Sequence, residues 1–301
     1  MTPAFGLAFA ALAALAVAAP AAAQDGTLKK IKDNGSITIG HRDASLPFSY
    51  YDDQQRPVGY SVEICARVVD ALKAELKMPK LDVKYQLVTS ANRIPLMANG
   101  TIDLECGSTT NNLERQKQVW FAVTTFVTAN RLVAKKASKI RKLDDMKGKT
   151  IVSTAGTTNI KQITELNAAR NLGMSIVSAN GHSESFLMVE SGRAVAFAMD
   201  DILLAGLVAS SKNPADYAIA PEALSIEPYG MMVRKDDTAF KKSVDGAIAA
   251  LFKSGAINKI YARWFQSPVP PRGVNLNVPM SAQLKKVIAN PTSSGDPKDY
   301  R

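Results

Sequence analysis

The stretch TIVSTAGTTNIKQITELNAARNLGMSIVSA, residues 150–179, decides the fold class. Residues 150–153 form a short apolar pattern that is typical of a buried strand. A small polar loop follows, and residues 159–172 then have a helical pattern. A second strand is predicted from Ser175 to Ser178. A strand, a helix and a strand in this order predict an α/β fold with a mostly parallel sheet.

The same alternation continues on both sides of this unit. Further strands are predicted at residues 36–40, 82–88, 103–106 and 194–199. Further helices are predicted at residues 61–76, around 94–97, and at 183–191. Ser90 is a candidate N-terminal cap for the helix around 94–97. Asp201 is a candidate cap for the helix that begins after Asp201. The length of 301 residues suggests about two such domains.

Four of the predicted strands end in small or charged polar groups. Ligands of open α/β sheets bind just beyond the carboxyl ends of the strands, where helix N-termini offer free N–H groups to anions. Turn chemistry explains any one such group, but four together favour a site for a polar ligand. The groups are Gly40-His41-Arg42, Gly107-Ser108-Thr109-Thr110, Gly156-Thr157-Thr158 and Asp200-Asp201. None of them matches a nucleotide-binding or hydrolase motif.

The composition is that of an ordinary globular protein, with 46% hydrophobic and 21% charged residues. It excludes a disordered chain, a coiled coil and a disulfide-dense mini-domain. Lys and Arg number 37 against 27 Asp and Glu, a formal net charge of +10. These basic residues are dispersed, so we interpret them as a solvated surface and expect no nucleic-acid binding. Two Cys and two His do not form a structural zinc motif, and we expect no metal and no cofactor.

The N-terminus predicts export. Residues 1–23 carry no charged side chain, and their Ala-rich apolar run ends in Ala21-Ala22-Ala23, which resembles a signal-peptide cleavage site. The run is too short and too Ala-rich to favour a membrane anchor. Export permits a disulfide between Cys65 and Cys106, and a pair of buried free thiols is an equal alternative. Residues 290–301 are rich in Pro, Ser, Gly and Asp, and we expect this tail to be disordered.

Several blocks of the chain together resemble the periplasmic amino-acid-binding proteins of ABC importers, and most of all the glutamate/aspartate-binding branch. They occur in the order and spacing of that family. They are Gly40-His41-Arg42, Pro47-Phe48-Ser49-Tyr50, Val58-Gly59-Tyr60-Ser61, Ser90-Ala91-Asn92-Arg93-Ile94-Pro95, Gly100-Thr101-Ile102-Asp103, Cys106 to Lys117, Gly156-Thr157-Thr158, Ser191 to Phe197, Met199-Asp200-Asp201 and Tyr229-Gly230.

The resemblance implies two α/β lobes joined by two crossing segments, with the ligand in the cleft between them. One lobe would comprise residues 25–128 and 229–301, and the other would be the insertion 129–228. It also implies a monomer in the periplasm, with the signal peptide cleaved near Ala23. Such a protein captures L-glutamate or L-aspartate and delivers it to the membrane permease of an ABC transporter, without catalysis.

The resemblance also implies roles for nine residues, and the charges of glutamate explain why they suit it. A ligand with two carboxylates and one ammonium needs two cationic partners and one anionic partner, because uncompensated buried charge costs several kcal/mol. Arg115 and Thr158 match the positions that bind the α-carboxylate. Asp200, with Ser108 and Thr110, matches the ammonium shell. The side-chain subsite corresponds to Arg42, Ser90, Arg93 and His182.

Two alternatives remain beside this interpretation. A broader binder would also accept glutamine or asparagine, although a neutral amide would leave Arg42 or Arg93 partly unpaired. An enzyme of the dehydratase type on the same scaffold would need a general acid or base beyond Asp200, which the ammonium would occupy. Arg42 is the most discriminating residue, because the family's binders of cationic amino acids carry an acid at its position.

Overall fold

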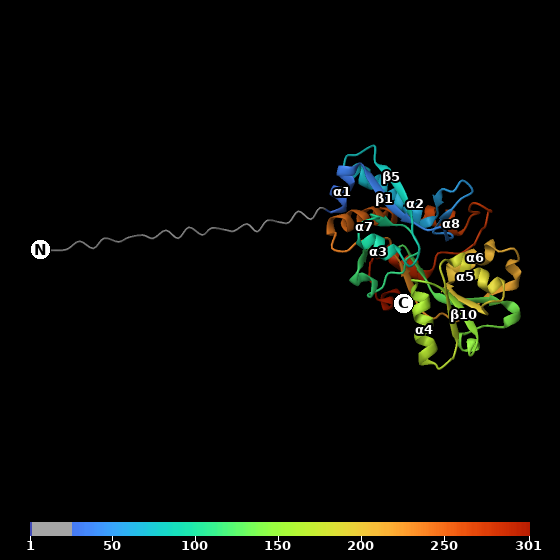
Figure 1. Ribbon diagram of the computed structural model, residues 1–301. Helices are drawn as coiled ribbons and strands as arrows, with labels where there is room; N and C mark the ends of the chain where they lie inside the picture. Colours follow the sequence, from blue (N-terminus) through green and yellow to red (C-terminus); the bar gives the residue numbers. More distant parts are fainter. Residues whose placement is uncertain (2–25) are drawn as a thin grey trace.

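The computed structural model describes Met1 and residues 26–301, so the predicted export signal lies outside the described residues apart from Met1. The described chain forms two α/β lobes that lie side by side (Figure 1). Each lobe is built around a five-stranded sheet. Among the described residues, no helix combines the length and the apolar character needed to cross a membrane.

The first lobe is built on a sheet whose spatial order is β5, β1, β6, β15, β7. Strand β1 is parallel to β5 and β6, whereas β15 is antiparallel to β6 and β7. Its strands are β1 (Ser36–His41), β5 (Asp82–Leu87), β6 (Leu104–Glu105), β7 (Val119–Phe121) and β15 (Met232–Arg234). Its helices are α1 (Thr27–Asn34), α2 (Tyr60–Glu75), α3 (Arg93–Ala98), α7 (Thr238–Lys253), α8 (Ala256–Phe265) and α9 (Ala282–Ala289).

The second lobe is built on a sheet whose order is β11, β10, β12, β9, β13, and it contains the unit predicted from residues 150–179. Strand β10 is parallel to β11 and β12, as that unit requires, and β9 is antiparallel to β12 and β13. Its strands are β9 (Asn130–Lys135), β10 (Thr150–Thr154), β11 (Ser175–Ala179), β12 (Ala196–Asp200) and β13 (Tyr217–Ile219). Its helices are α4 (Thr158–Ala169), α5 (His182–Glu190) and α6 (Asp201–Ser210).

Two antiparallel strands, β8 (Phe126–Thr128) and β14 (Glu227–Tyr229), connect the lobes. Their aromatic side chains join the core of the first lobe, where Phe126 stacks on Phe265 with ring centroids 5.0 Å apart and meets Phe48 edge-on at 4.9 Å. The connection is therefore anchored on one side. The remaining elements are β2 (Ala44–Ser45), β3 (Ser49–Tyr51), β4 (Pro57–Val58) and the 3-10 helices Arg115–Lys117, Lys136–Ser138, Leu143–Met146, Pro214–Asp216 and Pro297–Tyr300.

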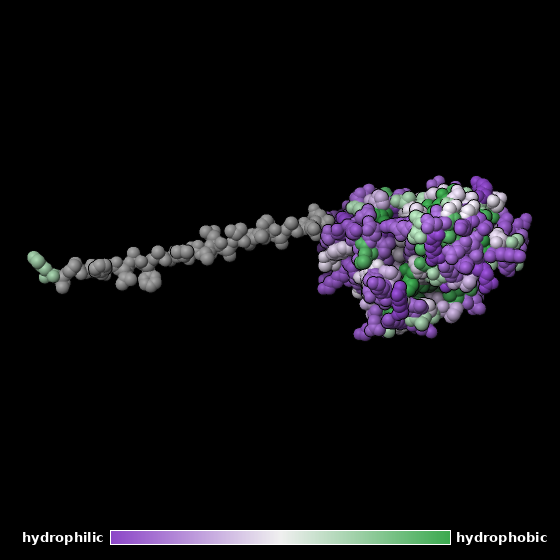
Figure 2. All heavy atoms as spheres, turned by 90° about the horizontal axis from the view of Figure 1, so that it is seen from below, coloured by the Kyte–Doolittle hydropathy of each residue, from purple (hydrophilic) through white to green (hydrophobic). Residues whose placement is uncertain are grey.

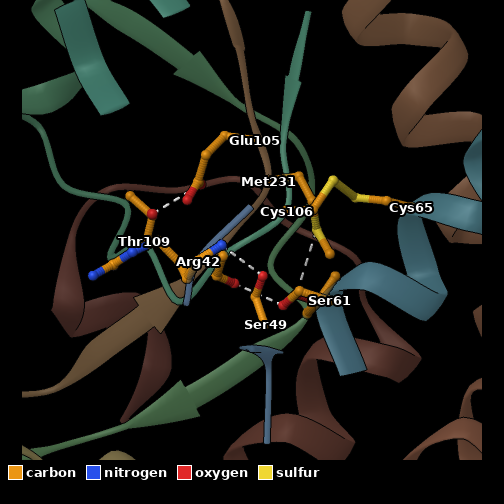
Figure 3. The surroundings of a disulfide bond; sticks show 10 residues. Arg42, Ser49, Ser61, Cys65, Glu105, Cys106, Thr109 and Met231 are labelled. Atoms are coloured by element: carbon orange, nitrogen blue, oxygen red, sulfur yellow. Dashed lines mark hydrogen bonds between the residues drawn. A yellow bond between two sulfur atoms is a disulfide. The ribbon is translucent and has the colours of Figure 1, made fainter. Parts of the chain in front are cut away.

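A disulfide joins Cys65 of α2 to Cys106, the residue after β6, with their Cα atoms 6.3 Å apart (Figure 3). Of the two alternatives left open by the sequence, the structure contains the crosslink. It ties a core helix to the strand end that leads into Gly107 and Ser108. Ser61 of the same helix donates a hydrogen bond of 2.7 Å to the carbonyl of Gly107, so two links hold this loop against α2.

The prediction of a disordered tail is wrong. Tyr300 is only 1% exposed and packs with Val127 of β8 and Val287 of α9. Its hydroxyl lies 2.8 Å from Thr124 Oγ1, and the Thr124 amide donates to the carbonyl of Thr292 at 2.7 Å. Composition indicated a solvated segment, but one buried aromatic side chain and a few backbone hydrogen bonds hold the tail on the connecting strands.

Candidate functional site

One cavity between the lobes is lined by seven of the nine predicted site residues. They come from strand ends and helix starts of both sheets, as expected for ligand sites of α/β proteins. The first lobe contributes Ser90, Arg93, Ser108 and Thr110, and the second contributes Thr158, His182 and Asp200. Four further lining residues had been given no role from the sequence, namely Thr157, Asn159, Met199 and Leu203, although Thr157 lies in one of the polar groups expected at a ligand site.

Arg42 and Arg115, the other two predicted residues, do not line this cavity. Arg42 follows β1, is 1% exposed, and lines a neighbouring cavity between the lobes together with Thr89 and Gly181. Arg115 is 7% exposed and bridges the lobes. Its Nη1 donates to the Thr110 carbonyl at 2.8 Å, and its Nη2 donates to the Gly156 carbonyl at 3.2 Å.

The three arginines concentrate buried positive charge on the first lobe. Burial lowers the pKa of Arg42 to about 10 and that of Arg115 to about 9, and repulsion from Arg93 adds to both shifts. Burial also lowers the pKa of Arg93. All three groups remain protonated at neutral pH. Buried cations of this kind require anionic partners, because each desolvated charge costs several kcal/mol when it is unpaired.

Several buried polar atoms of this region have no hydrogen-bond partner within the protein. Nearly all buried polar groups in native proteins form hydrogen bonds. A cluster of unpaired groups at one place therefore indicates that a bound ligand forms hydrogen bonds with them. The donors among them are Nε and Nη1 of Arg42, Nε of Arg93, Oγ of Ser90 and Oγ of Ser108, and Oε1 of Glu105 is an unpaired acceptor. Arginine N–H groups are donors only, and serine hydroxyls can donate. The cluster is therefore suited to bind an anion.

Asp200 supplies the one carboxyl in the lining of the cavity. It ends β12, and its two oxygens accept hydrogen bonds from Asn159 Nδ2 at 2.8 Å and from the Tyr229 hydroxyl. Burial, followed by repulsion from the Glu227 carboxylate, raises the pKa of Asp200 to about 7. A cationic group placed beside it would reverse this shift, because an opposite charge favours the ionised form. This carboxyl is therefore suited to an ammonium.

The second lobe adds neutral donors. His182 begins α5, and its Nδ1 lies 2.9 Å from Thr154 Oγ1. Burial, then the charges of Arg42 and Arg93, lower the pKa of His182 well below its usual value, so the ring is neutral. Thr158 is the first residue of α4, and its hydroxyl donates to Glu227 Oε2 at 2.9 Å.

The two predicted helix caps are wrong. The residue that precedes α3 is Asn92, which exchanges hydrogen bonds with Thr89, while the hydroxyl of Ser90 is buried and unpaired. Asp201 is the first residue of α6, so Asp200 holds the capping position, and the Asp201 carboxylate accepts hydrogen bonds from Thr128 Oγ1 and Arg131 Nε. Short polar side chains can hydrogen-bond to several nearby groups, and the sequence does not show which of these hydrogen bonds forms.

Two α/β lobes joined by a pair of strands, with charged and unpaired side chains facing one another between them, define a two-lobe solute-binding protein. The family model for bacterial extracellular solute-binding proteins, family 3, matches residues 37–267. The chain belongs to this family, as the sequence blocks predicted.

Among curated proteins, the chain is 55% identical to the L-glutamate/L-aspartate-binding protein of Pseudomonas aeruginosa, over 94% of each chain. It is 49% identical to the glutamate/aspartate import solute-binding protein of Salmonella typhimurium, over 91% of this chain and 90% of that one.

Among solved structures, a mutant of ArgBP from T. maritima superimposes with a TM-score of 0.71 at 27% identity, over 79% of this chain and 99% of that chain. An ancestral arginine-binding protein bound to arginine gives 0.69 at 27% identity, over 77% of this chain and 98% of that chain. The predicted two-lobe α/β fold is thereby confirmed.

Proposed function

We propose that this protein captures L-glutamate or L-aspartate between its lobes in the periplasm and delivers it to the permease of an ABC importer. The observation that carries the proposal is the cluster of buried, unpaired donors on Arg42, Ser90, Arg93 and Ser108, with one carboxyl, Asp200, in the opposing wall. That pattern of charge complements a solute with two carboxylates and one ammonium. The names of the two curated relatives agree with it.

The proposed lobes comprise residues 25–128 with 229–301, and residues 129–228, and residues 1–23 would be removed on export. Contacts between the lobes indicate how they close. Gly156 of the second lobe has φ +74° and packs so tightly on Ser90 and Ala91 that a Cβ would lie 2.5 Å from Ala91 Cα. Gly206 of α6 packs similarly on the carbonyl of Leu46. Closure of this kind encloses the ligand and marks the loaded state for the permease.

The ligand would lie with its α-carboxylate on Arg115, whose planar guanidinium can bond both carboxylate oxygens. Thr158, the first residue of α4, would add its backbone N–H from the second lobe, because its hydroxyl proton is donated to Glu227. The ammonium would bind Asp200, assisted by Ser108 and Thr110.

The side-chain carboxylate would bind Arg42 and Arg93, with Ser90 and His182 completing that subsite. A neutral amide would remove one charge from this end and leave a buried arginine partly unpaired. We therefore expect glutamate and aspartate to bind more tightly than glutamine or asparagine.

Thermal unfolding in the presence of each of the twenty amino acids tests the proposal. A ligand that binds only the folded state raises the melting temperature, and the shift grows with its affinity. We expect L-glutamate and L-aspartate to give the largest shifts in melting temperature. During prolonged incubation of either ligand with the protein, calorimetry should detect only the heat of binding and no heat of reaction. Equal stabilisation by glutamine would contradict the acidic specificity, and turnover of a prephenate-like substrate would favour an enzyme.

A further inference from the structure

A buried carboxylate lies behind the arginines of the proposed side-chain subsite. Glu105 is the last residue of β6 and is 0% exposed. Its Oε2 accepts a hydrogen bond of 2.8 Å from the hydroxyl of Thr109, which Figure 3 shows as a dashed line. The same hydroxyl accepts a hydrogen bond from Nη1 of Arg93. Neither Glu105 nor Thr109 lines the ligand cavity.

These contacts form a relay with a fixed direction. An ionised carboxylate accepts hydrogen bonds only, so Thr109 must give its single hydroxyl proton to Glu105. The lone pairs of the Thr109 oxygen are then available to the Arg93 N–H. The relay therefore holds Nη1 of Arg93 toward Thr109, and it leaves Nε, which has no partner in the protein, for a ligand.

Glu105 also acts on the charges of the site. Its negative charge favours the protonated forms of Arg42, Arg93 and Arg115 and so opposes the effect of their burial on the pKa values. The backbone at Gly107 packs directly on this carboxylate, since a Cβ there would lie 2.2 Å from Glu105 Oε1 and 3.1 Å from Arg42 Cγ. Arg42 and Glu105 therefore both pack against the same side of Gly107 and lie close to each other.

We propose that Thr109 and Glu105 are positioning residues that aim Arg93 at the ligand's side chain and thereby set the preference for an acidic over an amide side chain. The inference rests on the proposed function, because it assigns Arg93 to the side-chain subsite. A purely electrostatic role for Glu105 makes the opposite prediction, since removal of an anion beside a cationic subsite would tighten the binding of an acidic ligand.

The test compares Thr109→Val with Thr109→Ser. Valine removes the hydroxyl at nearly constant volume, and serine keeps it. Calorimetry with glutamate and with glutamine gives the affinities, and urea unfolding monitors stability. We expect Thr109→Val to weaken glutamate binding about tenfold more than glutamine binding, and Thr109→Ser to retain the wild-type ratio. The relay would be overturned if Thr109→Val lost the same affinity for glutamate as for glutamine. It would also be overturned if the two variants had the same ratio of glutamate to glutamine affinity.

Glu105→Gln is the second arm. It keeps the shape and one acceptor oxygen but removes the charge that fixes the direction of the Thr109 proton. We expect glutamate affinity to fall about tenfold and the ratio of glutamate to glutamine affinity to narrow. Tighter glutamate binding would overturn the positioning role. If the wild-type protein bound no acidic amino acid, the proposed function itself would fail, and the inference with it.

Discussion

The two walls of the cleft differ in how they are built. The first lobe contributes three buried arginines, and hydrogen bonds within that lobe hold two of them, Arg93 by Thr109 and Arg115 by the Thr110 carbonyl. The second lobe contributes the neutral groups of Thr158 and His182 and a carboxyl with a raised pKa. In the proposed function, the first lobe would therefore supply the charge that attracts an anion, and the second lobe would complete the site on closure.

The largest effect should follow from loss of the arginine that touches both walls. Arg115→Ala removes a buried charge partner, which typically costs about 2–5 kcal/mol. Glutamate affinity should therefore fall at least about 30-fold in calorimetry. Arg193→Ala, which removes an exposed arginine of the second lobe, should leave the affinity unchanged. Equal affinities of the Arg115 variant and the wild-type protein would exclude the proposed position of the α-carboxylate.

The pH dependence of binding tests the second wall. The pKa of Asp200 is raised to about 7, so the carboxyl carries a proton below that pH, and it must lose this proton to pair with an ammonium. Glutamate affinity should be highest near pH 8 and should fall about tenfold per unit below pH 7, where the ligand's own carboxylates remain ionised. It should also begin to fall toward pH 9, because the pKa of Arg115 is lowered to about 9 and its charge is lost there. Titrations from pH 5 to 9 measure this. Asp200→Asn should bind glutamate more weakly at pH 8. If the affinity of that variant still fell tenfold per unit below pH 7, a group other than Asp200 would be the one that takes up the proton.

Closure itself should be sensitive to a single methyl group, with the smallest effect of the three. In Gly206→Ala the new Cβ would lie 2.7 Å from the carbonyl oxygen of Leu46 in the other lobe. Overpacking of this kind costs about 1 kcal/mol or more, so glutamate affinity should fall about fivefold, and small-angle scattering should show a more open liganded form. Gly246→Ala is the matched control and should bind normally, because the added Cβ would have no atom within 4 Å apart from its chain neighbours and the backbone of its own helix. Normal binding by both variants would exclude this contact from closure.

Much of the fold follows from local sequence patterns. The strand predicted at residues 36–40 is β1 (Ser36–His41), and the helix predicted at 61–76 is α2 (Tyr60–Glu75). Periodic burial of apolar side chains produces these elements, and it is visible in the sequence. The tail was not predictable in this way, because its order depends on a distant pocket for Tyr300 that only the folded chain provides.

Candidate site residues could be predicted from the sequence where charged residues stand at strand ends. Residues that act from outside the cavity lining could not be predicted. Arg42 follows the apolar strand β1 and Asp200 is the last residue of the apolar strand β12, and such positions are visible in the sequence. Glu105 lies inside a strand pattern, and nothing in the sequence distinguishes a buried carboxylate from one that faces solvent. Gly206 likewise lies in a helix, and no feature of the surrounding sequence indicates its contact with Leu46, because that contact depends on the approach of the other lobe.

A crystal structure of the protein grown with L-glutamate is the most direct test of the opposed walls. We expect the α-carboxylate on Arg115, the side-chain carboxylate on Arg42 and Arg93, and the ammonium within hydrogen-bond distance of Asp200. A ligand bound elsewhere, with the three guanidinium groups turned into bulk solvent, would contradict this expectation.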